Sequence, residues 1–79
     1  MADQTTHDEE LDREQVADRL NDIASGFRSG EPLDVTVGNK NVTLHPTATI
    51  NYRIDVIEKR SRFRGDRETV RIELDWKPE

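Results

Sequence analysis

The chain ends on the stretch Thr69-Val70-Arg71-Ile72-Glu73-Leu74-Asp75-Trp76-Lys77, in which apolar and polar residues alternate strictly. Alternation with a period of two places the apolar side chains on one face of a β-strand and the charged side chains on the other. The pattern recurs earlier, at Leu33, Val35 and Val37, at Val42 and Leu44, and at Ile50, Tyr52, Ile54 and Val56. We therefore expect four strands, each with one apolar face.

One amphipathic helix precedes these strands. Asp12 is suited to be its N-cap, and Gln15 three positions later completes a capping box. Gly30 is typical of a helix end, because glycine adopts the left-handed conformation there without steric cost. The expected apolar face of the helix consists of Val16, Leu20, Ile23, Ala24 and Phe27.

The spacing of the strands predicts two hairpins. In the first we expect a two-residue turn at Asn39 and Lys40, with Val37 paired to Val42 and Val35 to Leu44. In the second, a register that opposed Asp55 to Glu73 would cost a few tenths to ~1 kcal/mol through like-charge repulsion. The expected pairs are therefore Ile54 with Ile72, Tyr52 with Leu74, Arg53 with Glu73, and Asp55 with Arg71.

Together these elements predict an α+β fold in two layers, with the amphipathic helix packed on one face of a four-stranded antiparallel meander. Residues 11–79 are expected to form this single domain, with a core of roughly fifteen apolar side chains, Trp76 the largest. Residues 1–10 are acidic and lack an apolar anchor that would offset the entropy of ordering them, so we expect a flexible N-terminal tail.

The composition limits the classes of function. The net charge is −5, which disfavours general attraction to nucleic acid or to an anionic membrane. The chain has no cysteine and begins with a polar segment, so we expect a cytoplasmic protein without disulfides or a membrane span. Arginine greatly outnumbers lysine. An acidic, lysine-poor surface suits a salt-rich cell interior of the halophile type, although compositional drift explains it equally well.

The pieces also resemble a known family. The resemblance rests on the order and spacing of the helix segment Arg13 to Leu20, the link Ser29 to Leu33, the hairpin Val37 to Leu44 and the terminal Ile72 to Trp76. In this arrangement the chain is similar to the amphi-Trp domain family, small proteins common in salt-loving archaea. The resemblance implies the fold and the setting, with no catalytic residues. It would also imply a strand before the helix, whereas Gln4 to Glu10 shows no alternation.

The strongest local anomaly is a basic segment between the last two strands, from Lys59 to Arg67, which we call the basic tip. Its candidate binding residues are Lys59, Arg60, Arg62, Phe63, Arg64 and Arg67. Arginines with an exposed aromatic ring suit nucleic acid, by phosphate neutralisation and base stacking. An acidic protein partner would use the same cations. The plain alternative is a solvated loop, with Phe63 folded back and the arginines paired to nearby carboxylates.

No other constellation points to chemistry. His7 and His45 are too few and too separated for a histidine metal site, and the carboxylates at residues 8–10 are typical of a solvated run. No nucleophile stands beside a base, so we expect no enzyme, no cofactor and no metal. We expect a small binding module for an unidentified protein partner, with nucleic-acid binding through the basic tip as the alternative. An uncovered sheet edge, together with Ile57 on the charged face, also allows a homodimer.

Overall fold

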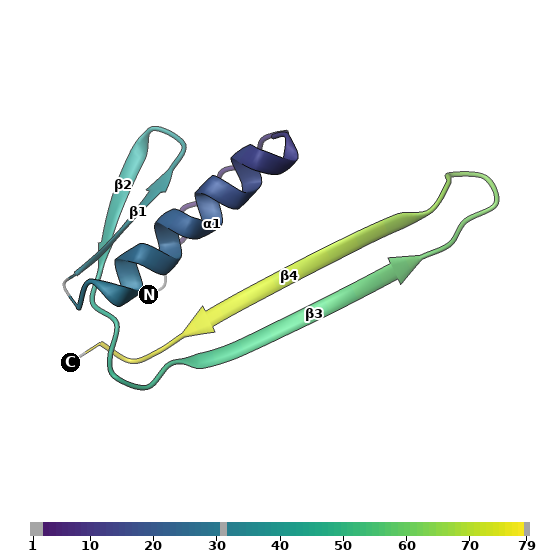
Figure 1. Ribbon diagram of the computed structural model, residues 1–79. Helices are drawn as coiled ribbons and strands as arrows, with labels where there is room; N and C mark the ends of the chain where they lie inside the picture. The colour runs from purple at the N-terminus through teal and green to yellow at the C-terminus, as the bar shows by residue number, and fades with distance from the viewer. Residues whose placement is uncertain (1–2, 31, 79) are drawn as a thin grey trace. The chain divides into compact units, whose positions relative to one another are not determined.

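The computed structural model describes residues 3–30 and 32–78, which form one helix and four strands (Figure 1). The elements are α1 (Arg13–Arg28), β1 (Leu33–Val37), β2 (Lys40–Leu44), β3 (Asn51–Lys59) and β4 (Arg67–Asp75). They belong to two compact units, of which residues 3–46 hold α1, β1 and β2, and Thr47–Lys77 hold β3 and β4. The predicted α+β class, with one helix and four antiparallel strands, is confirmed.

Both ends of α1 lie where the sequence predicts them. Asp12 Oδ1 accepts a hydrogen bond from the backbone N–H of Gln15 at 2.8 Å, and Gln15 Oε1 accepts one from the N–H of Asp12 at 3.1 Å. This reciprocal capping box satisfies donors that the first helical turn cannot pair. At the other end Ser29 is the C-cap, and Gly30 follows with a φ of 74°. The helix therefore ends at a residue whose conformation favours glycine.

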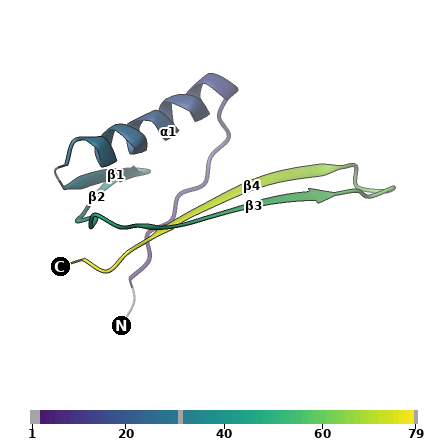
Figure 2. The ribbon, with the colours of Figure 1, turned by 60° about the horizontal axis from the view of Figure 1, so that its bottom comes forward.

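The first unit is held together by a close approach of α1 to β1. Leu33, the first residue of β1, is 2% exposed. A Cβ on Gly26 would collide with its Cδ1, so the leucine side chain packs directly on the helix backbone at that glycine. Figure 2 shows α1 running along one face of the β1–β2 hairpin. In the described part of the chain Leu33 is the only apolar side chain that is fully buried, a smaller core than expected.

The two halves of the helix face differ in burial. Ile23 and Phe27 are half-buried, whereas Val16 and Leu20 are 44% and 50% exposed. A helix of 16 residues is ~24 Å long, whereas a strand of five residues is only ~17 Å long. The short hairpin therefore covers only part of the apolar face that the periodicity predicts.

The predicted register of the first hairpin is wrong by two residues. Val35 pairs with Val42 and Val37 pairs with Lys40, so the turn is Gly38-Asn39. Gly38 has a φ of 62°, as expected at the first central position of a type II′ turn. The physical reason is that a shift of two residues leaves every side chain on the same face, so the alternation cannot choose between the two registers. The positive φ of Gly38 therefore determines the position of the turn and with it the register.

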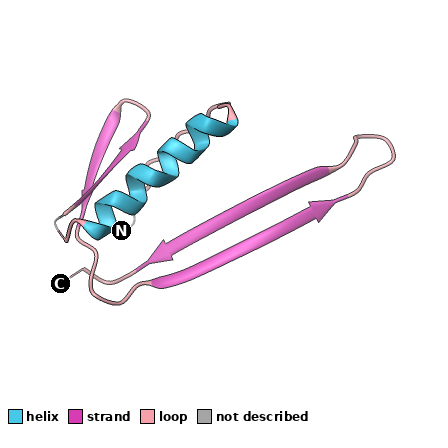
Figure 3. Cartoon of the chain, viewed as in Figure 1, coloured by secondary structure: helices cyan, strands magenta, loops and turns pink. Residues whose placement is uncertain are grey.

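The predicted register of the second hairpin is confirmed. Tyr52 pairs with Leu74, Ile54 with Ile72, and the two charged pairs lie opposite each other as expected. The ladder runs from Asn51↔Asp75 to Lys59↔Arg67, so the connection comprises residues 60–66, slightly shorter than the expected loop (Figure 3). Charge pairing therefore identified the register that apolar alternation alone left open.

The single four-stranded meander is not confirmed, because the strands lie in two sheets of two strands, β1–β2 and β3–β4. Residues 45–50 connect β2 to β3 and form a longer link than a tight hairpin turn. This connection therefore does not determine a register between the two strands. The apolar face of β3–β4 is exposed at Tyr52, Ile54, Val56, Val70, Ile72 and Leu74, and Trp76 beyond it is half-buried.

We expect Gly26→Ala to lower the free energy of unfolding by about 1–3 kcal/mol, because Leu33 must leave its position. Ordinary helix propensity would predict the opposite sign, a gain of about 1 kcal/mol. Urea unfolding followed by circular dichroism measures the change. The exposed Ser25→Ala is the matched control and should not destabilise. In a Leu33→Val background, which lacks the colliding Cδ1, the penalty should shrink; an unchanged penalty would refute this explanation.

Candidate interaction site

The basic tip is a defined turn at the end of the β3–β4 hairpin. Lys59 ends β3 and lies directly opposite Arg67, the first residue of β4. Between them, Ser61 Oγ accepts a hydrogen bond from the backbone N–H of Arg64 at 3.1 Å, and Gly65 has a φ of 77°. The hydroxyl stabilises the turn and the glycine provides the left-handed residue that returns the chain to β4.

All six predicted binding residues are exposed, and the structure brings them together on this one turn. Phe63 is 97% exposed, which for an apolar ring at the end of a hairpin leaves both faces open to a partner. Across residues 3–30 and 32–78, no carboxylate lies within ion-pair distance of a cation of the tip. Phe63 is therefore not folded back and the arginines are not paired within the described residues, whereas the tip is solvated, as the plain alternative expected.

Two like-charge pairs lie at the base of the tip. Glu58 opposes Glu68, and Lys59 opposes Arg67 on the next rung. Like charges directly opposite each other in an antiparallel ladder are unfavourable by ~0.2–1 kcal/mol per pair. Because successive side chains point to opposite faces, the two carboxylates cannot neutralise the two cations beside them in the ladder. These two pairs were not predicted, although they follow from the expected register when it is continued toward the tip.

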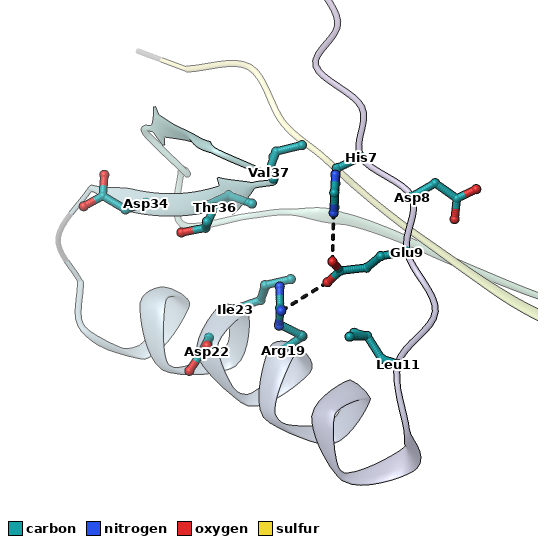
Figure 4. Close-up of a pocket in the computed structure, with 12 residues that line it drawn as sticks. His7, Asp8, Glu9, Leu11, Arg19, Asp22, Ile23, Asp34, Thr36 and Val37 are labelled. Atoms are coloured by element: carbon teal, nitrogen blue, oxygen red, sulfur yellow. Dashed lines mark hydrogen bonds and ion pairs between the residues drawn. The ribbon is translucent and has the colours of Figure 1, made fainter.

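A second polar cluster lies in the first unit, in a cleft of about 680 Å³ between residues 7–11, α1 and β1 (Figure 4). His7 Nε2 donates a hydrogen bond to Glu9 Oε2 at 2.9 Å, and Arg19 Nη2 lies 3.1 Å from Glu9 Oε1. His7 also lies against the β1–β2 turn, where a Cβ on Gly38 would come within 2.9 Å of its ring. The segment before α1 therefore contacts both α1 and the β1–β2 hairpin.

The electrostatics of this cluster favour an ionised Glu9. The hydrogen bond from His7 and the nearby Arg19 guanidinium lower the pKa of Glu9 below its ordinary value, and the hydrogen bond has the larger effect. Both charge partners are well exposed, at 54% for Arg19 and 36% for Glu9, so the pair is screened by solvent. The arrangement positions the chain segment against α1.

In the sequence, His7 lies in the expected flexible tail and Glu9 in a run of carboxylates expected to be solvated, and no signal in the spacing links Glu9 to Arg19. Residues 3–10 carry no helix or strand, and no strand precedes α1 within residues 3–12. The flexible tail remains a prediction. The described residues contain no group of three or more potential metal ligands. They also contain no helix that is long and apolar enough to cross a bilayer.

The comparisons with known proteins give one result. The family model described as the Amphi-Trp domain matches residues 2–79. No curated protein and no solved structure matches the chain.

We expect His7→Ala to raise the pKa of Glu9 more than Arg19→Ala does, measured by carbon-detected NMR of the Glu9 carboxyl. A lowered pKa in the folded state means that ionised Glu9 stabilises above its unfolded value near 4.5, and that this contribution is lost as pH falls through the lowered pKa. Arg13→Ala is the control and should leave Glu9 unchanged. An unchanged Glu9 pKa in His7→Ala would contradict the assignment.

Proposed function

The chain belongs to the Amphi-Trp domain family, and we propose that it is a small non-enzymatic binding module whose basic tip contacts an acidic surface of a partner protein. The observation that carries the proposal is the set of exposed, unpaired cations on one turn of a chain whose net charge is −5. The family description gives no activity.

The electrostatics of the tip support an anionic partner. Lys59 and Arg67 repel each other across the ladder, and Arg60, Arg62 and Arg64 add three cations beyond them. A carboxylate or phosphate placed here would relieve the repulsion and accept charge-assisted hydrogen bonds, bidentate ones from arginine. Like charges that face each other lower the stability of the fold when no residue of the chain neutralises them. Such an arrangement is typical of a binding site, where the partner supplies the opposite charge.

The composition supports a setting in the cytoplasm, with a salt-rich interior of the halophile type. The chain has no cysteine, and lysine is replaced largely by arginine on an acidic background. At 1 M salt the Debye length is ~3 Å, so only contacts at short range would retain their strength. Phe63 matters in such a medium, because its apolar contact area is not screened by ions.

Single-stranded nucleic acid is the second candidate, and the exposure of Phe63 favours it. The ring lies between Arg62 and Arg64 in sequence and is 97% exposed. An unpaired base stacked on an aromatic side chain gains ~1–3 kcal/mol, and flanking arginines would contact the phosphates. The net acidity of the chain counts against this candidate, because it repels the rest of the strand.

The first test is an amide NMR titration with a polyglutamate peptide at low and at molar salt. We expect shifts confined to residues 59–67, and about tenfold weaker binding for Arg62→Glu, because one attraction becomes a repulsion. The matched control is Arg13→Glu, an exposed residue of α1 whose reversal changes the net charge equally and should leave the affinity within twofold. Equal weakening by both variants would show a nonspecific charge effect and refute the site.

The second test separates the two partners through Phe63. Phe63→Leu keeps an apolar side chain but removes the ring, so it should weaken binding of a mixed single-stranded RNA and DNA pool roughly tenfold. Binding of polyglutamate should change little. Phe63→Tyr keeps the ring and should restore nucleic-acid binding. Failure of the pool to shift any resonance of the basic tip would remove the nucleic-acid candidate and leave the protein partner.

A further inference from the structure

The β3–β4 sheet has two strands, so each strand carries a free edge of unpaired backbone groups. β4 runs for nine residues, Arg67–Asp75, without proline, glycine or lysine. Proline and lysine are among the residues with which proteins protect an edge from pairing with another chain. A long regular edge beside an exposed apolar face is therefore a surface to which a further strand can be added.

The two strands of this hairpin share one short pattern. Arg53-Ile54-Asp55 on β3 and Arg71-Ile72-Glu73 on β4 both place an isoleucine between an arginine and a carboxylate. Inside the hairpin the two triplets lie opposite each other in reverse order, so isoleucine faces isoleucine and each arginine faces a carboxylate. Such a triplet is also complementary to an antiparallel copy of itself.

The ion pairs distinguish the two edges. On β3, Arg53 Nε lies 3.4 Å from Asp55 Oδ2, so the two charges of this triplet pair with each other. On β4, neither Arg71 nor Glu73 makes an ion pair or a side-chain hydrogen bond with any residue in the described ranges. Both side chains are exposed. The charges of β4 are therefore the ones that remain for a partner.

We propose that the free edge of β4 binds the β4 edge of a second copy of this chain, antiparallel, with Ile72 on the two-fold axis. The surface is distinct from the basic tip and does not depend on its function. In this register Arg71 of each copy faces Glu73 of the other, which gives two charge pairs related by symmetry. The remaining rungs pair Val70 with Leu74 and Thr69 with Asp75 of the second copy.

The neighbouring registers are less favourable. Pairing centred on Arg71 would oppose two arginines, and pairing centred on Glu73 would oppose two glutamates. A shift by one residue would place the apolar side chains of the two copies on opposite faces. Beyond Thr69 and Asp75 the next charged rung would oppose Arg67 to Lys77, so repulsion limits the length of the ladder. Of these neighbouring registers, the charge pattern favours the one centred on Ile72.

The product is a four-stranded antiparallel sheet, β3–β4 followed by β4–β3 of the second copy. A two-fold axis perpendicular to the sheet keeps the apolar faces of both copies on the same side. The exposed side chains of β4 then gain cross-strand neighbours, with Ile72 beside Ile72 and Val70 beside Leu74 of the second copy. Because an isolated two-stranded hairpin is marginally stable in water, a sheet of four strands is the more stable arrangement.

The absence of cysteine allows a direct test by single-cysteine cross-linking. In Ile72→Cys the two thiols face each other across the axis, where opposed Cα atoms lie ~4.5–5.5 Å apart, within the range of a disulfide. In the control Val70→Cys the two Cα atoms lie about 14 Å apart, because each opposes residue 74 on the neighbouring strand. In a glutathione redox buffer we expect Ile72→Cys to form disulfide dimers at least about tenfold faster. Equal rates would overturn the proposal.

A charge-swap experiment tests the register without altering the apolar face. By sedimentation velocity we expect the wild type to be dimeric, and Arg71→Glu and Glu73→Arg each to be monomeric, because like charges then meet across the axis. A mixture of the two variants should form heterodimers, because the opposed charges are complementary again. A monomeric wild type would refute the proposal, as would single variants that remain dimeric or a mixture that stays monomeric.

Discussion

The contact of Leu33 with the helix backbone at Gly26 is the constraint on which the first unit depends. A helix capped at Asp12 and ended by Gly30 still needs tertiary packing, because most helical stability in proteins comes from the buried face. Glycine at position 26 lets β1 begin close to the helix axis, and the short hairpin then follows along α1. The absence of one methyl group therefore determines where the sheet meets the helix.

The second unit depends on a different constraint, the alternation of side chains along β3 and β4. Alternation separates an apolar from a charged face, and the two arginine-isoleucine-carboxylate triplets fix the register between the strands. Because the same triplets lie opposite each other inside the hairpin and are complementary to themselves, one pattern serves folding and offers a recognition surface. The face that alternation creates stays exposed in the described chain.

Much of this arrangement could be predicted from the sequence, and the exceptions have identifiable causes. Opposite charges at Arg53 and Glu73 identified the register of the second hairpin. The first hairpin has no such charges, so the alternation left a two-residue ambiguity that the positive φ of Gly38 resolves. Whether the four strands join in one sheet could not be deduced from the sequence. Period-two patterns identify the faces of a strand and contain no information on which edges pair.

The position of the candidate site could be predicted, because charge is read directly from the sequence. The exposure of its side chains could not, because exposure depends on the folded structure. The cations of the basic tip stood out in an acidic chain, whereas the exposure of Phe63 required the turn that Ser61 and Gly65 form. The contacts of His7 and Glu9 join segments distant in sequence, and no periodicity connects them.

The like-charge rungs Glu58↔Glu68 and Lys59↔Arg67 have a consequence for the dynamics of the hairpin. Repulsion on successive rungs makes this end the part of the ladder that opens first, so local stability decreases toward the turn. An anion held between Lys59 and Arg67 would bind the closed form more tightly than the open one and would shift this local equilibrium. Ligand binding and closure of the last rungs are therefore thermodynamically linked, and the end of the hairpin would become rigid as its partner arrives.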